Sequence, residues 1–325
     1  MSAPIPLTLA HSPDPDDVFM WWPLTGKIRP DGTMLEPPRL DTGRFTFRAL
    51  PADIHLLNRR AIERGDLDVT ALSARAYCDV KDRYAITSCG GSFGDGYGPK
   101  LVARKDVTPD EIAVNCINCV KAADVRVAVP GRQTTAFLLL CLAMGLPREK
   151  IAQQQARFVE MPFERIIGAV ARREVEAGLV IHEGQVTFGD AGLRMVLDVG
   201  AWWKQRTGLL TPLGVNAVRR GLDAEHGVGT VTEVSRLLRE SVRYAMDRRE
   251  ESTAYALPFA LANVDRAGAA TGETPTLERV DRYCRMYVTE QTLDMGESGR
   301  EAIVRLLREG ASLGLCPDPG SVDLV

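Results

Sequence analysis

The order in which strand-like and helix-like stretches follow one another constrains the fold of this chain most strongly. Short apolar runs predict buried strands, and stretches with helical spacing of apolar residues lie between them. Such repeated units predict an α/β fold with sheets flanked by helices. One set of units ends near residue 104, a second set extends to about 212, and a strand at 212–218 returns to the first set. We therefore expect a larger discontinuous lobe (1–104 and 213–325, with a helical tail), a smaller lobe (105–212) and a cleft between them.

The individual elements can be read from the same patterns. Strands are expected at 6–10, 45–50, 67–72, 84–88, 100–104, 125–129, 158–161, 178–181, 193–199 and 212–218. Helices are expected at 18–24, 54–64, 74–80, 136–144, 162–173, 231–262, 277–287 and 297–309. Asp16 or Asp17 is the expected N-cap of the first helix, and Pro258 the expected break in the long one. Residues 27–44 have no clear period and are expected to form an irregular loop.

Composition excludes several classes of protein. The chain has 325 residues, is 45% apolar and carries a net charge of −3, without a lysine- and arginine-rich run, so we expect no nucleic-acid partner. It has no apolar run of the ~20 residues that span a membrane and no secretory signal at its N-terminus. Seven scattered cysteines fit a reducing compartment, and we expect a cytoplasmic protein. Cys116 and Cys119 form a lone C-x-x-C pair in a polar insertion, 106–123, which is a weak metal or redox signal.

The stretch AGLVIHEGQ carries the clearest candidate for catalysis. Its apolar run predicts a buried strand that presents His182 and Glu183 at its C-terminal end, where α/β sheets bind ligands. A histidine there suits proton transfer, because its ordinary pKa is about 6.5. The alternative is that His182 only hydrogen-bonds a loop. Glu183 is expected to point away from His182 and to be structural.

Three loops add candidate binding residues. Ser12, Asp14, Asp16 and Asp17 follow the first strand, and they predict hydroxyl or cation recognition, or simple helix capping. The glycine-rich loop 89–98, which includes Gly96, offers a backbone that a ligand can approach closely. Thr134, Thr135 and Ala136 offer hydroxyls and free N–H groups at a helix start, or a threonine that merely caps its own helix.

Several segments, taken in order, resemble the 1,4-dihydroxy-6-naphthoate synthase family of the futalosine route to menaquinone. They read SPDPDDVF from Ser12, DIHLLNRRAIERGDLDVTALSARAY from Asp53, GDGYGPKLVAR from Gly94, PGRQTTA from Pro130, AGLVIHEGQVTF from Ala177 and GLLTPLGVNAVRR from Gly208. Two tail segments, SVRYAMDRREESTAYA and VDRYCRMYVTEQTLDMGESGREAI, match as well. The resemblance implies a two-lobed fold of the type 2 periplasmic-binding-protein kind, used as a cytoplasmic enzyme.

The resemblance also implies an activity and its residues. It implies a cofactor-free carbon–carbon lyase, without a metal, that converts cyclic dehypoxanthine futalosine to 1,4-dihydroxy-6-naphthoate. The general base falls on His182. The substrate contacts fall on Ser73, on Thr134, Thr135 and Ala136, and on the first-loop residues Ser12, Pro13, Asp14, Asp16 and Asp17.

The first loop departs from the family. It usually reads S-P-C-P-N-D, whereas Asp14 and Asp16 stand here in place of the cysteine and the asparagine. Asp95 and Tyr97 differ from the expected residues too, and 27–44 and 106–123 are longer than usual. Two alternatives to the lyase therefore stay open: a divergent member that acts on another small carboxylated substrate, and a solute-binding protein without chemistry. The expected partner is a small molecule in each case, and the sequence leaves the oligomeric state open.

Overall fold

Two sheets form the frame of the protein in the computed structural model, which describes residues 3–105, 125–267 and 274–325. The larger sheet has the order β4 (Phe45–Pro51), β1 (Ile5–His11), β5 (Val69–Ser73), β13 (Thr211–Arg219) and β6 (Tyr84–Ile86), and β7 (Ser92–Gly94) also pairs with β13. β1 runs parallel to β4 and β5, whereas β13 is antiparallel to its neighbours. The sheet is therefore mixed.

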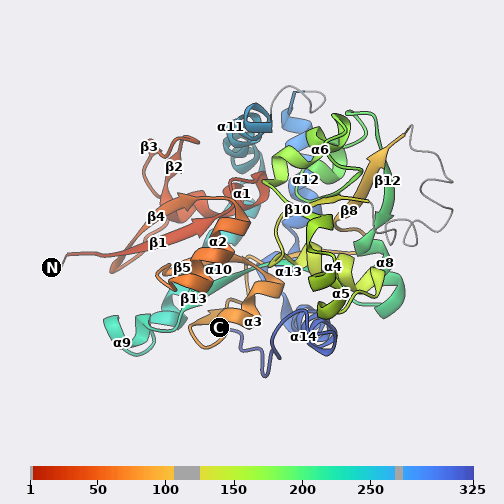
Figure 1. Cartoon of the computed structure of the whole chain (residues 1–325). Coiled ribbons are helices and arrows are strands. Elements are labelled where there is room, and N and C mark those ends of the chain that lie inside the picture. Colours follow the sequence, from red (N-terminus) through yellow and green to blue (C-terminus); the bar gives the residue numbers. More distant parts are fainter. Residues whose placement is uncertain (1–2, 106–124, 268–273) are drawn as a thin grey trace.

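The smaller sheet is built from the middle of the chain. Its order is β10 (Phe158–Glu160), β9 (Val127–Val129), β11 (Ala177–Val180), β8 (Lys100–Arg104) and β12 (Leu193–Asp198). β8 thus belongs to the smaller sheet, so the chain passes between the sheets before β8 and not after Arg104. Figure 1 shows the two sheets side by side, with the larger one on the left.

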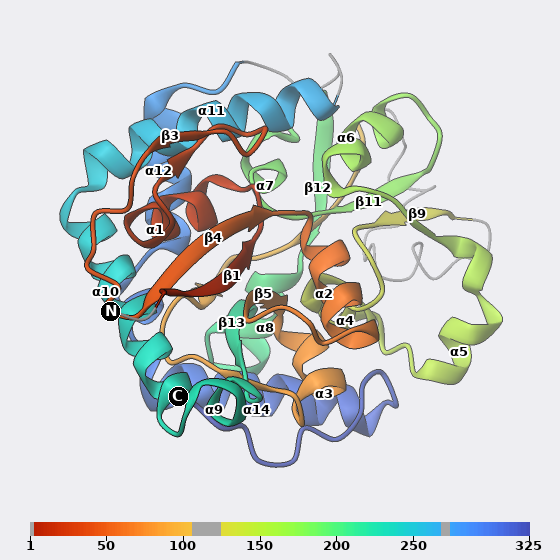
Figure 2. The same ribbon diagram turned by 90° about the vertical axis from the view of Figure 1, so that its left-hand side faces the viewer.

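Helices flank both sheets. Those of the first half are α1 (Pro15–Thr25), α2 (Ile54–Glu63), α3 (Tyr77–Val80), α4 (Thr135–Met144), α5 (Arg148–Gln153), α6 (Phe163–Ala171), α7 (Gly184–Thr187) and α8 (Val199–Thr207). Those of the second half are α9 (Leu222–His226), α10 (Thr230–Asp247), α11 (Arg249–Ala267), α12 (Leu277–Tyr287), α13 (Glu290–Leu293) and α14 (Gly296–Ser312). α1 packs against α10, α11 and α12. Figure 2 shows α1, α10 and α11 gathered beside β1 and β4, with α2 on the opposite side.

One apolar core extends through both lobes. It includes Leu72 and Ala217 of the larger sheet, Val129 of the smaller sheet and Trp203 of α8. α4 lies within this core and is apolar on all sides, so it is buried along nearly its whole length. A second core lies within the larger lobe, where Trp21 of α1 packs with residues of β1, β4 and the C-terminal helices.

Three expectations about elements were wrong. Residues 27–44 contain a two-stranded ribbon, β2 (Lys27–Ile28) and β3 (Met34–Glu36), which is too short to show a period in sequence. The first helix begins at Pro15, not after Asp16 or Asp17, because proline fits the first helical position and aspartates suit the first turn. Pro258 lies inside α11, and the break falls instead at Arg248, whose backbone is not helical.

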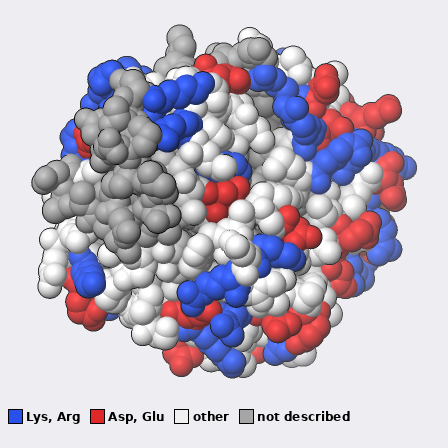
Figure 3. Space-filling model, turned by 90° about the vertical axis from the view of Figure 1, so that its right-hand side faces the viewer, with Lys and Arg blue, Asp and Glu red and all other residues white. Residues whose placement is uncertain are grey.

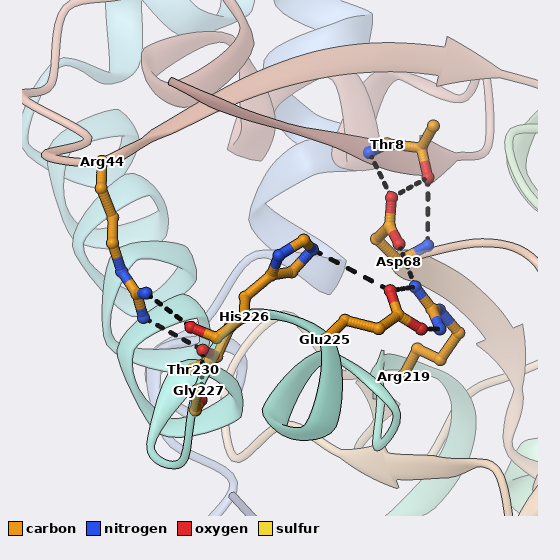
Figure 4. A network of polar contacts seen from close by, with 8 residues as sticks. All are labelled: Thr8, Arg44, Asp68, Arg219, Glu225, His226, Gly227 and Thr230. Atoms are coloured by element: carbon orange, nitrogen blue, oxygen red, sulfur yellow. Dashed lines mark hydrogen bonds and ion pairs between the residues drawn. The ribbon is translucent and has the colours of Figure 1, made fainter. Parts of the chain in front are cut away.

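A polar network joins strands of the larger sheet to α9 and α10 (Figure 4). The Asp68 carboxylate accepts hydrogen bonds from the backbone and hydroxyl of Thr8 at 2.9 and 3.0 Å. Arg219 donates to Asp68 at 2.9 Å and also pairs with Glu225 of α9. The network therefore joins β1, the start of β5, the end of β13 and α9. Arg44, which directly precedes β4, donates a hydrogen bond to the Thr230 hydroxyl at the start of α10.

The surface is mixed in charge. Figure 3 shows positive and negative side chains interspersed over the face that carries the smaller lobe. Among the described residues, no helix is both long and apolar enough to cross a bilayer. Five cysteines in the described ranges are free and buried, and Cys116 and Cys119 lie outside those ranges.

Candidate active site

A cavity lies between the two sheets, at the edge where their strands deliver loops. Residues that follow β1, β9 and β11 line it, together with the end of β5, the middle of β13 and two tyrosines of α12. The predicted site residues that line it are Ser12, Asp14, Asp16, Asp17, Ser73, Thr134, Thr135, Ala136 and His182. Gly96 is not brought to this cavity: it is exposed, and the glycine loop contributes Gly90 and Ser92 instead.

The first loop is folded by its own aspartates. Asp17 accepts a hydrogen bond from the backbone N–H of Ser12 at 2.8 Å, which closes the turn before α1. Asp14 occupies the N-cap position of α1, but its side chain makes no capping bond. Its carboxylate accepts the Ser12 hydroxyl and faces His182. Asp14 therefore faces the cavity rather than capping the helix.

His182 crosses from the smaller lobe to meet that carboxylate. Its Nδ1 lies 2.8 Å from Oδ2 of Asp14, which is completely buried. The His182 backbone has φ +53°, a left-handed conformation that is uncommon outside glycine. The ring of Phe163 packs against the imidazole edge-to-face, with 4.6 Å between the ring centroids. Nε2 of His182 is buried and has no hydrogen-bond partner in the described part of the chain.

Burial and charge shift the pKa values of the acids in this site. Burial and the neighbouring charge of Asp14 raise the pKa of Asp16 to about 6. Burial and the charge of Asp16 raise the pKa of Asp17 to about 8. Burial opposes protonation of His182, but the charge and hydrogen bond of Asp14 prevail and raise its pKa to about 10. Burial also opposes ionisation of Asp14, but His182 keeps its pKa below the ordinary value. Ionisable groups with such shifted pKa values are typical of functional sites.

Neutral groups line the opposite wall. Asn58 of α2 donates to the Ser73 hydroxyl at 2.9 Å and accepts from the Ser73 backbone at 2.9 Å. The Ser73 hydroxyl proton therefore remains available to a ligand. Thr134 caps α4 by accepting from the Phe137 backbone, and Thr135 donates its hydroxyl to the Leu213 carbonyl at 2.6 Å.

The start of α4 can receive an anion. Backbone N–H groups in the first turn of a helix have no intrahelical acceptor, and the helix dipole favours negative charge there. Thr135 and Ala136 occupy this turn and line the cavity. The hydroxyls of Thr134 and Thr135 hydrogen-bond other groups of the protein. The backbone N–H groups of Thr135 and Ala136 are therefore the donors that remain for a carboxylate.

Sequence reasoning missed the contribution of the C-terminal tail. Tyr283 and Tyr287 of α12 both line the cavity, and the Tyr287 hydroxyl donates to Gln185 at 2.8 Å. Their four-residue spacing puts them on one helix face, which is a visible signal, but nothing in the sequence shows that α12 reaches the cleft. Asn216 of β13 is a further lining residue that the strand pattern alone did not single out.

Glu183 lies at a different cavity from His182. It lines a second, more apolar cavity on the other side of the His182 turn, with Phe163, Ile167 and Val280. One carboxylate oxygen accepts from the Asn263 amide at 3.1 Å, and the other is buried without a partner among the described residues. Burial and the charge of Asp14 raise the pKa of Glu183 to about 8. Among the described residues, no three His, Cys, Asp or Glu side chains are placed to hold a metal ion.

The two sheets and the cavity between them form a fold of the periplasmic-binding-protein type. The alkanesulfonate-binding protein of Xanthomonas axonopodis pv. citri, solved with MOPS bound, shares the fold with a TM-score of 0.58 at 13% identity, covering 99% of this chain and 98% of its own. Within that fold class, the chain belongs to the menaquinone biosynthesis family, whose model matches residues 7–312.

Individual relatives agree with this family. The 1,4-dihydroxy-6-naphthoate synthase of Thermus thermophilus is 36% identical over 96% of this chain and 97% of its own length. The synthase of Streptomyces coelicolor is 35% identical over 97% and 96%. A crystal structure of a protein from Archaeoglobus fulgidus is 38% identical, with a TM-score of 0.74 over 95% of this chain and 98% of that one. The resemblance inferred from the motifs is thus confirmed at the level of the family.

Proposed function

We propose that this protein is a 1,4-dihydroxy-6-naphthoate synthase, a lyase that forms this naphthoate from cyclic dehypoxanthine futalosine. The observation that carries the proposal is the meeting of His182 with the start of α4 in one cavity of a chain from this family. One side of the cavity offers a proton-transfer group, and the other offers an anion site of the kind a carboxylated aromatic substrate needs.

The residues suggest how the reaction proceeds. The N–H groups of Thr135 and Ala136 hold the substrate carboxylate, and the Ser73 hydroxyl donates a further hydrogen bond. Nε2 of His182, in its neutral form, removes a proton from the bound substrate. The carbon–carbon bond that joins the sugar-derived ring to the aromatic part then breaks, the sugar-derived part leaves as a separate fragment, and the product becomes aromatic. General base catalysis of this kind contributes typically about 10²–10⁴-fold to a rate. In this proposal the reaction needs no cofactor.

We extend the proposal to the cytoplasm as the location and to a small molecule as the partner. The five described cysteines, all buried and free, fit a reducing compartment.

An anaerobic turnover assay with cyclic dehypoxanthine futalosine tests the proposal. Wild-type protein should release dihydroxynaphthoate, detected by mass spectrometry, and His182→Asn should lower kcat about 10²–10⁴-fold because no group remains to take the proton. His226→Asn is the matched control, since His226 lies on α9 and does not line the cavity. A folded wild-type protein that forms no product, or an active His182→Asn variant, would contradict the proposal.

A divergent lyase is the second candidate, and the carboxyl groups of the first loop favour it. Asp14, Asp16 and Asp17 all line the cavity, so this chain places three carboxyl groups beside the proposed site of an anionic substrate. Substrates with hydroxyl or cationic groups near the first loop would suit those carboxylates better. Failure of the turnover assay, with thermal stabilisation by other small aromatic carboxylates, would select this candidate.

A further inference from the structure

We propose that Asp14 is the positioning residue for His182: it holds the imidazole through Nδ1 and so directs Nε2 into the cavity. This inference rests on the proposed function, in which His182 takes a proton from the substrate. The Nδ1–Oδ2 distance is 2.8 Å and Asp14 is completely buried, so the contact is shielded from water. The two partners come from different lobes, Asp14 from the end of β1 and His182 from the end of β11.

Both partners depart from locally favoured structure to make this contact. Asp14 lies at the N-cap of α1, where an aspartate side chain ordinarily accepts a hydrogen bond from a backbone N–H and so stabilises the helix. That capping bond is absent here. His182 adopts φ +53°, a left-handed conformation that is unfavourable for a residue other than glycine. Such strain persists only where the surrounding structure fixes it, and it gathers at functional sites.

The contact decides which ring nitrogen can exchange a proton with a ligand. A carboxylate at Nδ1 requires that this nitrogen carry the hydrogen, so Nε2 holds the lone pair in neutral His182. Phe163 packs against the ring and limits its rotation. The Ser12 hydroxyl donates to the same oxygen, Oδ2 of Asp14, that faces His182. The ring is thereby fixed in orientation and tautomer.

Other charged and titratable groups face the same pair. They come from the end of β1, the first turn of α1, the residues that precede α2 and α7, and from α6 and α12: His11, Asp16, Asp17, Asp53, Glu183, Glu164 and Tyr283. Asp14 is the group whose side chain hydrogen-bonds Nδ1 of His182. Its removal should therefore lower the proton affinity of the ring more than removal of any other.

Nitrogen-15 NMR of ring-labelled histidine tests the inference without turnover. The wild-type His182 signals, assigned with His182→Asn, should show an imidazolium that persists to about pH 10, and at higher pH a neutral ring protonated at Nδ1. Asp14→Asn should lower the titration midpoint by about 2 pH units or more, a 100-fold loss of proton affinity. Asp14→Glu should recover part of that shift, because it restores a carboxylate.

The pH profile of turnover provides the second reading. Because a base must be neutral, wild-type kcat/KM should rise with pH until the pH passes the titration midpoint of His182. In Asp14→Asn, this rise in kcat/KM should occur at lower pH. At the optimum, Asp14→Asn should also lose about 10²–10⁴-fold in kcat, because the tautomer and orientation are no longer fixed.

Each outcome bears on the inference in a definite way. A wild-type ring that titrates near 6.5, or a neutral ring protonated at Nε2, would overturn it even if Asp14→Asn did not fold. An unchanged midpoint in folded Asp14→Asn would do the same. If the NMR result is as expected but no naphthoate is formed, the positioning contact stands and the proposed substrate fails.

Discussion

Two consecutive residues that follow β11, His182 and Glu183, line two different cavities. His182 lines the main cavity and Glu183 the second one, as the sequence predicted when it placed Glu183 away from His182. The predicted reason was wrong, because side-chain alternation on an extended strand does not apply here. β11 ends at Val180, His182 is left-handed and Glu183 begins a helical turn. A single backbone reversal therefore separates the two side chains.

Glu183→Gln should stabilise the protein in a pH-dependent way. The ordinary pKa of a glutamate is about 4.5, and that of Glu183 in the fold is about 8, so the folded state loses stability as the pH rises between these values. Glutamine stays neutral and keeps an oxygen for Asn263. The gain in Tm should be near zero at pH 4.5, grow to about 2–6 °C at pH 8 and then level off.

Differential scanning calorimetry across this pH range measures the effect. Glu174→Gln, which replaces an exposed carboxyl in the same lobe, is the matched control for the loss of a carboxylate. A flat difference for Glu183→Gln would show that Glu183 ionises in the fold as readily as in water.

At the scale of elements, β13 holds the larger lobe together. It pairs with β5, β6 and β7, and Arg219 at its end joins Asp68 before β5 to Glu225 of α9. The exposed fraction of the Arg219 side chain is 20% and that of Asp68 is 16%, so these hydrogen bonds compete little with water. Partly buried, charge-assisted bonds of this kind are worth more than surface pairs.

Arg219→Ala should therefore destabilise the protein by about 1–3 kcal/mol, measured as a lower free energy of unfolding in urea. The comparison is Arg236→Ala, which removes an exposed pair with Glu240 on the surface of α10 and should cost about 0–0.5 kcal/mol. Equal losses for the two variants would mean that the network of Figure 4 adds nothing beyond an ordinary surface pair.

Elements with their own local signals were predictable, and contacts between elements were not. Local strand-end and helix-start signals singled out Thr134 and His182, and the family resemblance singled out Ser73; all three line the cavity. The sequence could not show that Asp14 meets His182, because the pair joins two lobes and no local pattern records it. The place of α12 at the cleft depends on packing over α1 and α11 in the same way. The prediction that Pro258 breaks the helix failed because proline is only a local penalty, which tertiary packing can outweigh.

At the scale of the whole molecule, the shared core makes the two lobes one folding unit. Residues of both sheets, α4 and α14 belong to the same apolar cluster. The four tryptophans form two pairs, Trp21 and Trp22 on α1 in the larger lobe, and Trp202 and Trp203 on α8 beside the smaller sheet. Each pair can therefore report on a different lobe.

We expect a single cooperative transition in urea. In a variant with Trp21 and Trp22 replaced by phenylalanine, fluorescence follows only the smaller lobe, whereas far-ultraviolet circular dichroism follows the whole chain. The two midpoints should coincide, because the core that crosses between the lobes cannot be lost from one of them alone. The reciprocal variant, with Trp202 and Trp203 replaced, should give the same agreement. Separate midpoints within either variant would show that the lobes unfold independently.

The position of β13 also bears on how the protein is made on the ribosome. β13 lies between β5 and β6 in the larger sheet, yet it begins only at Thr211, after every strand of the smaller sheet. The nascent chain therefore exposes β5 and β6 without their shared neighbour until the middle of the chain has been synthesised. The smaller sheet needs nothing beyond β12, so all its strands are available before those of the larger sheet. The edges of β5 and β6 that later pair with β13 thus stay unpaired during this time, and unpaired strand edges are prone to associate with other chains.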